Sequence, residues 1–557
     1  MTEVKRNQKK EGFGVKTFPV PLALNEIVEN ITITTNSPSQ SSKAQIIEQA
    51  IQLHRKGNIS EAIKLYQFLI NQGLKDHRVF SNYGLILKDR GKLKEAELST
   101  RKAIKLNPNF AISHSNLGTI LKDLGKLKEA ESSTRKAIKL NPDFADAYNN
   151  LGNILKELGK KNESELSTRK AIEIKPDFAN AHYNLGNFLK DLGKLKEAEI
   201  STRKAIKLDP DFASAHYNLG LIILQKSDCE LSFKYFSKSA ELLRSQKNQE
   251  SSHKRFTTIS KAKIEHDIEQ LEYLATKGIE NEKFRNLAIL YKKVASEINW
   301  PSETELISLS NKHQSLLQLN YNRLIHQKEA PKLKQKAVNN SLNVEEITNN
   351  YFNHEFGLTY IDDFLSPTAL ESLRKFLLES TIWFDIKKGG YLGAYLKEGL
   401  ASPLIIQIAD ELRKRFPKIF KDQPINQIWA FKYDSRAKNK SSSVKGINVH
   451  ADQAAINVNF WITPKEANLN SDSGGLIVYD VEAPKKWDFK TYNNDEKRIK
   501  EELKKSKGNA TVIPYNENRA VVFNSNLFHE TDKYEFKKGY ENRRINVTML
   551  FGMRNNN

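Results

Sequence analysis

Apolar and polar positions in the first half of the chain recur every 34 residues. Each repeat holds two stretches of helix length, for example 114–124 and 127–140, in which apolar residues follow the spacing of a helix face. The first stretch of each repeat carries an apolar or aromatic residue followed by glycine. The glycines of this series are Gly84, Gly118, Gly152, Gly186 and Gly220. The pattern predicts a series of helical hairpins.

Two further series indicate where the helices end. Glycines at the same spacing stand where the first helix of a hairpin would stop, and prolines separate one hairpin from the next. They are Gly57, Gly91, Gly125, Gly159 and Gly193, and Pro108, Pro142, Pro176 and Pro210. Glycine in the first helix and a small residue such as Ala130 in the second allow close approach. Because one hairpin cannot bury both of its faces, we expect the hairpins to stack into a superhelix.

This pattern resembles the tetratricopeptide repeat, with about six units over residues 43–246. The resemblance implies a module that holds protein or peptide partners in a concave groove. Asparagines stand just before the apolar residue and glycine of the first helix, at Asn116, Asn150, Asn184 and Asn218. Two interpretations of them stay open: they line the groove and bind a peptide backbone, or they face solvent as remnants of repeat duplication.

The chain on either side of the repeats differs in composition. Residues 1–42 are rich in Asn, Ser and Thr and form an N-terminal extension, and 247–345 read as a helical spacer that ends in a polar linker at 327–344. From 346 to 557 the pattern changes to short apolar runs of strand length. These runs are 427–433, 447–450, 456–462, 476–479, 520–523 and 545–551.

Two helices precede these strands, and each begins with a Ser-Pro pair that caps its first turn, at Ser366 and Ser402. Helices followed by several short strands predict a jelly roll flanked by helices. The whole chain is therefore expected to be a multidomain α + β protein, with an α-solenoid before a β domain.

Three residues of the β domain have the chemistry of metal ligands. His450 and Asp452 stand two apart in an extended stretch, so both side chains point to the same face. His529 follows the predicted strand 520–523 and could reach the same point from a facing strand. Two histidines and one carboxylate form the ligand triad that leaves open positions on non-haem Fe(II).

An arginine near the end of the chain could hold a carboxylate, because its planar guanidinium pairs with that group through two hydrogen bonds. Arg544 begins the last predicted strand, and its side chain shares one face with Asn546 and Thr548. Arg543 would point to the opposite side, so Arg544 is favoured over its neighbour as the anchor.

His450-x-Asp452, the distal His529 and Arg544-Ile545-Asn546 together resemble the 2-oxoglutarate- and Fe(II)-dependent oxygenases, over about 351–552. The stretches around Tyr433, 459–464, 474–476 and 518–523 look most like the prolyl-hydroxylase-like branch. In that branch the arginine motif is usually Arg-x-Ser, whereas this chain has Arg-x-Asn, and the interval from His529 is longer than in common members. Both departures leave the identity of the anchoring arginine open.

The resemblance implies a double-stranded β-helix that hydroxylates a C–H bond of a protein or small-molecule substrate. His450, Asp452 and His529 would hold Fe(II), and Arg544, Tyr433 and Asn546 would bind 2-oxoglutarate. Oxygen is the second cosubstrate, and the family allows a requirement for ascorbate. Residues 482–509 interrupt the strands and are either a lid or a solvated insertion.

Composition narrows the remaining function classes. The excess of 88 Lys and Arg over 67 Asp and Glu gives a net charge of +21, but it is spread through the repeats without an aromatic-containing basic cluster, so nucleic acid is not the expected partner. The single cysteine, Cys229, excludes an intramolecular disulfide framework and a Cys-rich metal site. Without a visible secretory segment or an 18-residue apolar run, we expect a cytoplasmic protein with no membrane partner. The alternative to an enzyme is a repeat scaffold with an inert jelly roll.

Overall fold

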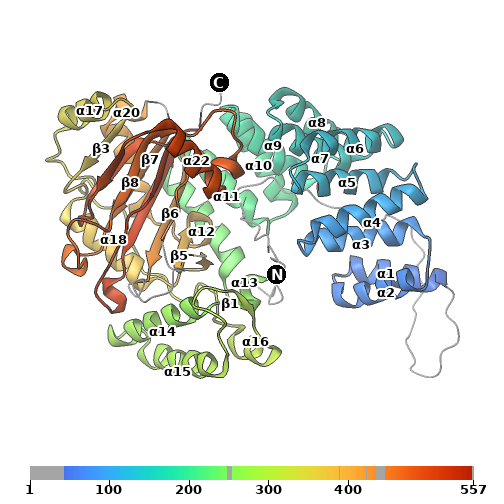
Figure 1. Cartoon of the computed structure of the whole chain (residues 1–557), viewed down its shortest axis with the longest axis horizontal. Helices are drawn as coiled ribbons and strands as arrows, with labels where there is room; N and C mark the ends of the chain where they lie inside the picture. The colour runs from blue at the N-terminus through green and yellow to red at the C-terminus, as the bar shows by residue number, and fades with distance from the viewer. Residues whose placement is uncertain (1–42, 247–253, 388, 422, 435–445, 555–557) are drawn as a thin grey trace. The chain divides into compact units, whose positions relative to one another are not determined.

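The computed structural model describes residues 43–246, 254–387, 389–421, 423–434 and 446–554. It contains two compact units, residues 1–210 and 211–557 (Figure 1). The expected N-terminal extension, 1–42, lies outside the described residues. None of the helices within the described ranges combines the length and the apolar character needed to cross a bilayer.

The first unit is a series of helical hairpins, as the 34-residue pattern predicts. Its helices are α1 (Lys43–Arg55), α2 (Ile59–Asn71), α3 (His77–Asp89), α4 (Leu93–Leu106), α5 (Ala111–Asp123), α6 (Leu127–Leu140), α7 (Ala145–Glu157), α8 (Lys161–Ile174), α9 (Ala179–Asp191) and α10 (Leu195–Leu208). The glycines between paired helices are left-handed, as at Gly125 with φ of 79°. This glycine ends α5 shortly before α6 begins.

Close helix packing explains the glycine in the first helix of each hairpin. A Cβ atom built on Gly118 would lie 2.0 Å from Thr134 Oγ1 and 3.2 Å from the Ala130 carbonyl oxygen. The small residue Ala130 is fully buried, as the sequence pattern predicts. Thr134, which the pattern did not single out, fills the remaining space and donates to the Ala130 carbonyl oxygen at 2.9 Å.

The recurring asparagines join consecutive hairpins. The side-chain amide of Asn116 donates to Ser81 Oγ at 3.2 Å, and that of Asn150 donates to Ser115 Oγ at 3.2 Å. Asn184 repeats the contact with Asn149 Oδ1 at 2.8 Å. All three asparagines are at most 1% exposed. Both interpretations from the sequence are therefore wrong for these three side chains. Each is buried between two first helices, so it neither faces solvent nor lines a groove open to a peptide.

Exposed ion pairs link the second helices. Glu131 on α6 accepts from Arg135 in the next turn at 2.9 Å and from Lys160, just before α8, at 3.0 Å. Arg135 also reaches Glu163 on α8, at 2.6 Å. The equivalent residues of the neighbouring hairpins make the same contacts: Glu97 with Arg101 and Lys126, and Glu165 with Arg169 and Lys194.

Two antiparallel sheets form the centre of the second unit. The larger has the strand order β3-β10-β7-β12-β6-β5-β4 and the smaller β11-β8-β9 (Figure 1). The strands are β3 (Leu358–Ile361), β4 (Asp385–Ile386), β5 (Tyr391–Tyr395), β6 (Ile425–Tyr433), β7 (Ile456–Trp461), β8 (Leu476–Glu482), β9 (Ala510–Ile513), β10 (Ala520–Asn524), β11 (Leu527–Thr531) and β12 (Ile545–Phe551).

Most of the predicted strands are present. Those at 427–433, 456–462, 476–479, 520–523 and 545–551 fall in β6, β7, β8, β10 and β12. The predicted run 447–450 contributes only a β-bridge at His450. The pattern did not predict β3, β4, β5, β9 and β11, because strands of two to five residues are too short to show a period.

Helices surround the sheets. They are α11 (Ala213–Gln225), α12 (Cys229–Arg244), α13 (Lys254–Thr257), α14 (Lys261–Thr276), α15 (Asn281–Glu297), α16 (Asn311–Leu317), α17 (Val344–Asn353), α18 (Pro367–Glu379), α19 (Pro403–Arg415), α20 (Pro417–Phe420), α21 (Phe489–Asn494) and α22 (Glu496–Ser506), with two short strands, β1 (Thr258–Ile259) and β2 (Ile307–Ser308). Ser366 and Ser402 cap α18 and α19 as predicted, accepting from Ala369 N and Ile405 N.

The two faces of the larger sheet have different neighbours. On β12, Val547 and Met549 belong to the same core as Leu373 of α18 and Ile408 of α19. The alternate residues face the other way, and on that side Tyr433 and Trp461 of the larger sheet pack with Val478 and Leu527 of the smaller one. One face is therefore covered by helices, and the other encloses the space between the sheets.

The hairpin α11–α12, which the sequence prediction places in the repeat array, belongs to the second unit. Tyr217, Leu221 and Phe236 are part of the helix-covered core. Arg244 at the end of α12 donates to Glu398 Oε1 at 2.7 Å, and both side chains are 6% exposed. Glu398 lies in a short 3₁₀ turn, η1 (Leu396–Glu398), after β5. The hairpin is thus part of the β unit's own core.

Residues 327–344, predicted as a linker, pack against the same core. Ala337 and Val338 are 0% and 1% exposed, and their backbone N–H groups donate to Glu411 Oε2 of α19 at 2.8 and 3.0 Å. Val338 also forms a β-bridge with Leu365. The polar composition of this segment reflects its outward-facing side chains. Its few apolar side chains pack into the core, and its backbone forms hydrogen bonds with α19.

Candidate functional site

Two extended segments meet at the smaller sheet and bring His450 beside His529. The two residues form a β-bridge, in which each backbone N–H donates to the other's carbonyl oxygen at 3.0 and 2.8 Å. The backbone N–H of Asp452 donates to the carbonyl oxygen of Ser525, just before β11, at 3.2 Å. The backbone pairing therefore fixes both segments, although they are far apart in sequence.

The side chains of these three residues converge. Nε2 of His450 lies 3.7 Å from Asp452 Oδ1, and Nε2 of His529 lies 3.5 Å from Asp452 Oδ2. One ligand atom from each residue lies within 4.8 Å of the other two. Adjacent ligand atoms about 2.1 Å from one metal ion stand about 3 Å apart. The observed spacings are only slightly wider.

Hydrogen bonds orient each of the three side chains. Nδ1 of His450 lies 2.8 Å from the carbonyl oxygen of Asn448, and Nδ1 of His529 lies 3.0 Å from that of Leu527. A carbonyl only accepts, so each Nδ1 is the donor in these bonds, and each Nε2 is the nitrogen that faces Asp452. The amide of Asn457 donates to Asp452 Oδ2 at 2.8 Å. Both imidazoles are thus oriented with Nε2 toward the Asp452 carboxylate, as ligation of one metal ion by all three side chains requires.

The predicted anchor Arg544 is buried between the sheets and 2% exposed. Its Nε donates to the carbonyl oxygen of Gly474 at 2.7 Å and its Nη2 to that of Gly475 at 3.1 Å. A Cβ atom on Gly475 would lie 1.9 Å from the carbonyl oxygen of Ile513, so only glycine permits this close approach. The two glycines therefore do more than turn the chain, because they hold the guanidinium.

Several polar atoms around Arg544 have no hydrogen-bond partner among the described residues. They are Nη1 of Arg544 itself, Nε1 of Trp461 and the hydroxyl of Tyr534, all buried. Both rings lie close to the guanidinium, with centroids 5.7 and 6.0 Å from its carbon. Buried donors are nearly always paired in native proteins. Three unpaired donors around one cation are what an anionic ligand would satisfy.

Arg543 points to the opposite side of the sheet. Its Nε donates to Glu269 Oε2 of α14 at 2.9 Å, and its Nη1 lies 3.8 Å from Asp434 Oδ2. These partners already neutralise its charge. Of the two arginines, only Arg544 shares the face that encloses the space between the sheets.

Tyr433 and Asn546, the other predicted contacts of a cosubstrate, lie on the same face as Arg544. The guanidinium of Arg544 stacks on the Tyr433 ring at 4.6 Å. Burial raises the pKa of the Tyr433 hydroxyl in spite of the opposing effect of Arg544, so this group stays protonated near neutral pH. The amide of Asn546 donates to Asn459 Oδ1 and Thr548 Oγ1, each at 3.3 Å, and its own Oδ1 has no partner among the described residues.

Sequence reasoning missed Asn457 and Tyr534 as parts of the site, and it favoured a core role over ligand contact for Trp461. A signal for the first was present: Asn457 and Asn459 alternate with Ile456, Val458 and Phe460 in a strand that is buried on both faces. A polar residue at every second position of such a strand indicates a polar lining on one face. No comparable signal marks Trp461 or Tyr534, because aromatic residues are ordinary components of a core.

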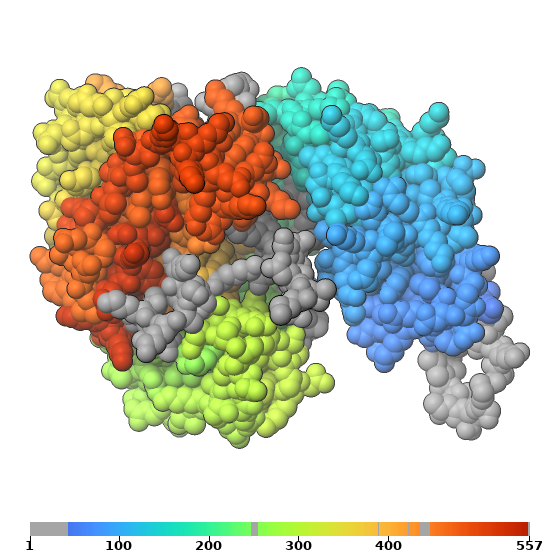
Figure 2. Space-filling model, in the orientation of Figure 1, coloured from blue at the N-terminus to red at the C-terminus, as the bar shows by residue number. Residues whose placement is uncertain are grey.

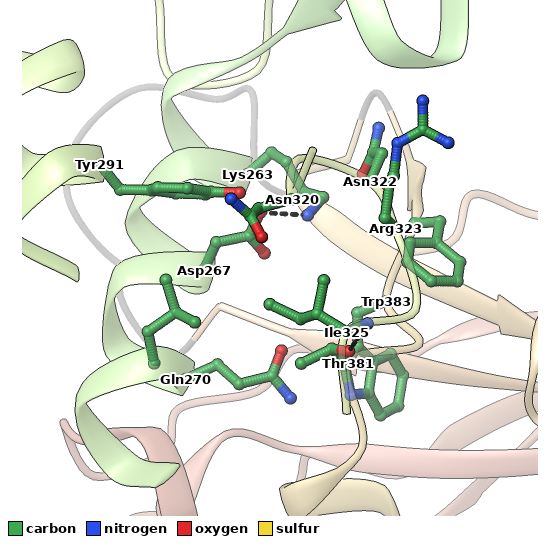
Figure 3. Close-up of a pocket in the computed structure, with 12 residues that line it drawn as sticks. Lys263, Asp267, Gln270, Tyr291, Asn320, Asn322, Arg323, Ile325, Thr381 and Trp383 are labelled. Atoms are coloured by element: carbon green, nitrogen blue, oxygen red, sulfur yellow. Dashed lines mark hydrogen bonds and ion pairs between the residues drawn. The ribbon is translucent and has the colours of Figure 1, made fainter. Parts of the chain in front are cut away.

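A small cavity lies away from this site, between α14 and the segment 320–325 (Figure 3). Lys263 forms a close ion pair with Asp267 at its edge, and Asn322 donates to the Arg255 carbonyl oxygen at 2.6 Å. The cavity measures about 30 Å³, which is room for a water molecule rather than for a substrate. This cavity therefore does not compete with the site between the sheets.

Family models of the tetratricopeptide repeat match one continuous stretch of the chain. They cover residues 77–110 and 145–178, 100–132, 118–159, and 179–212. No curated protein matches the chain.

Solved structures resemble limited parts of the chain. A structure of the APC/C hetero-tetramer Cut9-Hcn1 is 17% identical over 36% of this chain and 40% of its own, with a TM-score of 0.35, so this chain spans less than half of it. YrrB, described as a TPR protein with an unusual peptide-binding site, is 22% identical over 32% of this chain and 92% of its own, with a TM-score of 0.26.

TTC0263, described as a thermophilic TPR protein of Thermus thermophilus, is 18% identical over 35% of this chain and 98% of its own, with a TM-score of 0.29. The family models and the hairpin geometry of the first unit agree on the repeat. Residues 77–212 of this chain are tetratricopeptide repeats.

Proposed function

We propose that this chain is a 2-oxoglutarate- and Fe(II)-dependent dioxygenase that hydroxylates a C–H bond, with its repeats serving as a protein-interaction module. The observation that carries the proposal is the convergence of His450, Asp452 and His529 on the smaller sheet, opposite a buried and partly unpaired guanidinium on the larger one. Tyr433 connects the two, because it stacks on Arg544 and its hydroxyl lies 3.4 Å from Thr531 Oγ1, two residues after His529. A set of metal ligands and a cationic anchor are the two parts that such an enzyme needs.

The arrangement of the sheets supports a double-stranded β-helix for this unit. Two antiparallel sheets pack against each other, with Tyr433 and Trp461 from the larger sheet and Leu476 and Val478 from the smaller one in a shared cluster. A β-strand domain of this kind closes around an interior that can hold a small ligand. The two packed sheets therefore support the jelly roll that the sequence predicts.

The three converging side chains fit a ferrous ion. Two imidazoles with Nε2 lone pairs turned toward one carboxylate match the triad of non-haem iron enzymes, and the hydrogen bonds to Asn448, Leu527 and Asn457 hold all three in position. When bound, the metal supplies oxidative chemistry in which substrate C–H, 2-oxoglutarate and O2 give substrate C–OH, succinate and CO2.

Arg544 is suited to bind the distal carboxylate of 2-oxoglutarate. Gly474 and Gly475 fix its plane through Nε and Nη2, which leaves Nη1 to donate to an anion. The protonated Tyr433 hydroxyl and the Trp461 N–H are further donors nearby. Phe523 and Leu527, both fully buried, help to keep water from this side of the site.

The repeats support a polypeptide as partner. Residues 77–212 match tetratricopeptide repeats, and stacked repeats of this kind form an extended concave surface that suits a polypeptide. A prolyl or other side chain of a protein is therefore the first substrate to test, and a small metabolite or a sugar is the second.

Release of labelled CO2 tests the chemistry. Purified full-length protein with Fe(II), ascorbate and 1-¹⁴C-2-oxoglutarate should release CO2, and His529→Ala or Asp452→Ala should reduce the release at least about 100-fold. His354→Ala is the matched control, because this half-buried histidine pairs with Asp480 outside the triad. Equal rates in wild type and triad variants would refute the assignment.

Metal analysis separates the enzyme from a non-catalytic scaffold. Wild-type protein reconstituted without oxygen should retain one iron per chain after desalting, and Asp452→Ala should retain little. If wild type retains no iron and releases no CO2, the inert scaffold is the function that remains.

The substrate can be sought with the full chain. Partners crosslinked to Asp452→Ala protein should include a polypeptide that gains 16 Da when wild-type protein, Fe(II) and 2-oxoglutarate are added. A product of that mass among small metabolites alone would assign the small-molecule class.

A further inference from the structure

The segment between β8 and β9, which contains α21 and α22, packs against the metal-ligand strands. Trp487, Tyr492 and Ile499 of this segment are 8%, 3% and 0% exposed. It therefore is not the solvated insertion considered from the sequence. Figure 1 shows α22 in front of the strands, and the orange-red surface of this region faces the viewer in Figure 2.

Helix α21 forms hydrogen bonds with both backbone polar groups of Ala451, the residue between the ligands His450 and Asp452. The N–H of Ala451 donates to the carbonyl oxygen of Tyr492 at 2.9 Å. The side-chain amide of Asn493 donates to the Ala451 carbonyl oxygen, also at 2.9 Å. These two bonds fix the peptide groups that link His450 to Asp452, at the edge of the segment opposite to the edge that pairs with His529.

The neighbours of the ligands pack on the same segment. Val449 and Ala451 flank His450, and Phe528 precedes His529. All three belong to one buried cluster with Tyr492 and Ile499. Because side chains alternate along extended backbone, each ligand points toward the triad while its neighbour points into this cluster. The segment thus supports both ligand-bearing strands from behind.

Two more contacts complete the support. Glu496 at the start of α22 accepts from the amide of Asn448 at 2.8 Å, and the backbone carbonyl of Asn448 is the group that orients His450. On the far side, the guanidinium of Arg554 lies 4.1 Å from the Tyr492 ring. The segment is therefore tied both to the ligand strand and to the end of the chain.

We propose that α21 and α22 form a buttress, defined by residues 487–506, that holds the His450–Asp452 segment in its ligating shape before a metal arrives. Asn493 is the central positioning residue, because its side chain bridges the buttress to the carbonyl between the two ligands. The inference rests on the proposed metal site and adds to it the element that shapes that site.

The expected effect follows from pre-organisation. Without the Asn493 bond, the Ala451 peptide can rotate, so metal binding must first order the segment. Loss of a group that supports metal ligands usually weakens affinity about 10- to 100-fold. The change should appear in the metal affinity and in the motion of the metal-free protein, and not only in turnover.

Titration of metal-free, full-length protein with Co(II) under anaerobic conditions, followed by visible absorption, is the test. Asn493→Ala, and Asn493→Leu as a variant that fills similar space without a donor, should bind Co(II) roughly 10- to 100-fold more weakly than wild type, with altered band positions. Asn494→Ala, at the exposed next position of the same helix, should match wild type. Thermal unfolding of each metal-free protein checks that it folds.

Hydrogen exchange gives the second readout. The Ala451 amide should be protected in metal-free wild type and should exchange faster in both Asn493 variants. Folded Asn493 variants that bind Co(II) within about twofold of wild type, with unchanged Ala451 protection, would overturn the buttress and leave the metal site intact. If wild-type protein itself binds no Co(II), the proposed function fails and the buttress fails with it.

Discussion

The two units place their charges differently. In the repeats, Glu131 and its partners Arg135 and Lys160 form ion pairs at the surface, with the two cations 47% and 43% exposed. In the β unit, Arg244 and Glu398 form a pair that is 6% exposed on both sides. Surface pairs contribute little and are replaceable, whereas breaking a buried pair leaves an uncompensated charge.

The difference shows how each unit tolerates change. A repeat contacts only its neighbours, so damage to one hairpin should stay local. The β unit draws its core from α11, the segment 327–344 and both faces of one sheet, so damage there should spread. All five tryptophans follow residue 299, so their fluorescence reports on the β unit alone, while far-UV circular dichroism is dominated by the helices of both units.

Glu398→Ala should have the largest effect on stability. It leaves Arg244 buried without its carboxylate and should lower the free energy of unfolding of the β unit by about 3–5 kcal/mol. Urea unfolding followed by tryptophan fluorescence measures this. The control is Glu241→Ala, which breaks an exposed pair with Lys238 on the same helix and should cost less than about 0.5 kcal/mol. Equal effects would remove the contrast between buried and exposed pairs.

Gly118→Ala tests whether damage in a repeat stays local. The added Cβ would meet Thr134 Oγ1, and the overpacking should cost about 1–3 kcal/mol, reduced by the roughly 1 kcal/mol that alanine gains in a helix. Adding Thr134→Ala should recover most of the loss. Circular dichroism at 222 nm should show the change while tryptophan fluorescence unfolding stays as in wild type. A shift of both signals would mean that the repeat unit is coupled to the β unit.

Acid should weaken the β unit through Glu398. Burial alone would raise the pKa of this carboxyl, but Arg244, together with Lys397 and Arg255, more than offsets that effect and holds the pKa below its ordinary value. The contribution of the ionised Glu398 carboxylate to the free energy of unfolding is therefore complete above its pKa in the unfolded chain, about 4.3. This contribution is lost as the pH falls through the lower pKa of the folded protein. Between these values, the free energy of unfolding should fall up to about 1.4 kcal/mol per pH unit more steeply in wild type than in Glu398→Gln.

Glu131→Gln should have the smallest effect. It removes two exposed ion pairs of the repeats and should cost less than about 1 kcal/mol, an effect that 1 M NaCl largely removes. Urea unfolding followed at 222 nm, at low and high salt, measures it. A loss above about 2 kcal/mol would show that the surface network contributes more than isolated pairs do.

Local patterns explain what the sequence predicted well. Gly118 and Gly125 act through contacts within one hairpin, and the strand 545–551 alternates apolar and polar residues from Ile545 to Met549. The metal triad was also predictable as a set, because His450 and Asp452 stand two apart in extended chain. The structure brings His529 beside them, while its role as an iron ligand stays a prediction.

Contacts between distant segments explain what the sequence did not predict. Nothing near Trp461 or Tyr534 indicates that both rings surround Arg544, because that contact forms only when the sheets pack. The packed state of 327–344 depends likewise on Glu411 in α19. Predicting either the rings around Arg544 or the packing of 327–344 would require knowledge of the tertiary fold.

The sequence of the hairpin α11–α12 differs from the earlier repeats notably at two positions, although it keeps their 34-residue period. It keeps the glycine of the repeat at Gly220, but Leu224 stands where earlier first helices carry lysine, and Phe236 stands where earlier second helices carry threonine such as Thr202. Phe236 also takes the place of that threonine against the glycine. These apolar replacements mark a hairpin that packs into the core of the second unit.

The same hairpin determines where the chain can be divided. A fragment beginning at 247, where repeat periodicity would end the array, would lack Tyr217, Leu221 and Phe236 and would expose the hydrophobic surface they cover. Such a fragment should aggregate, whereas a fragment beginning at Asp211 keeps the α11 and α12 residues that cover this hydrophobic surface. The last hairpin of the 34-residue pattern thus belongs to the second unit, so the border between the two units lies inside the repeat pattern itself.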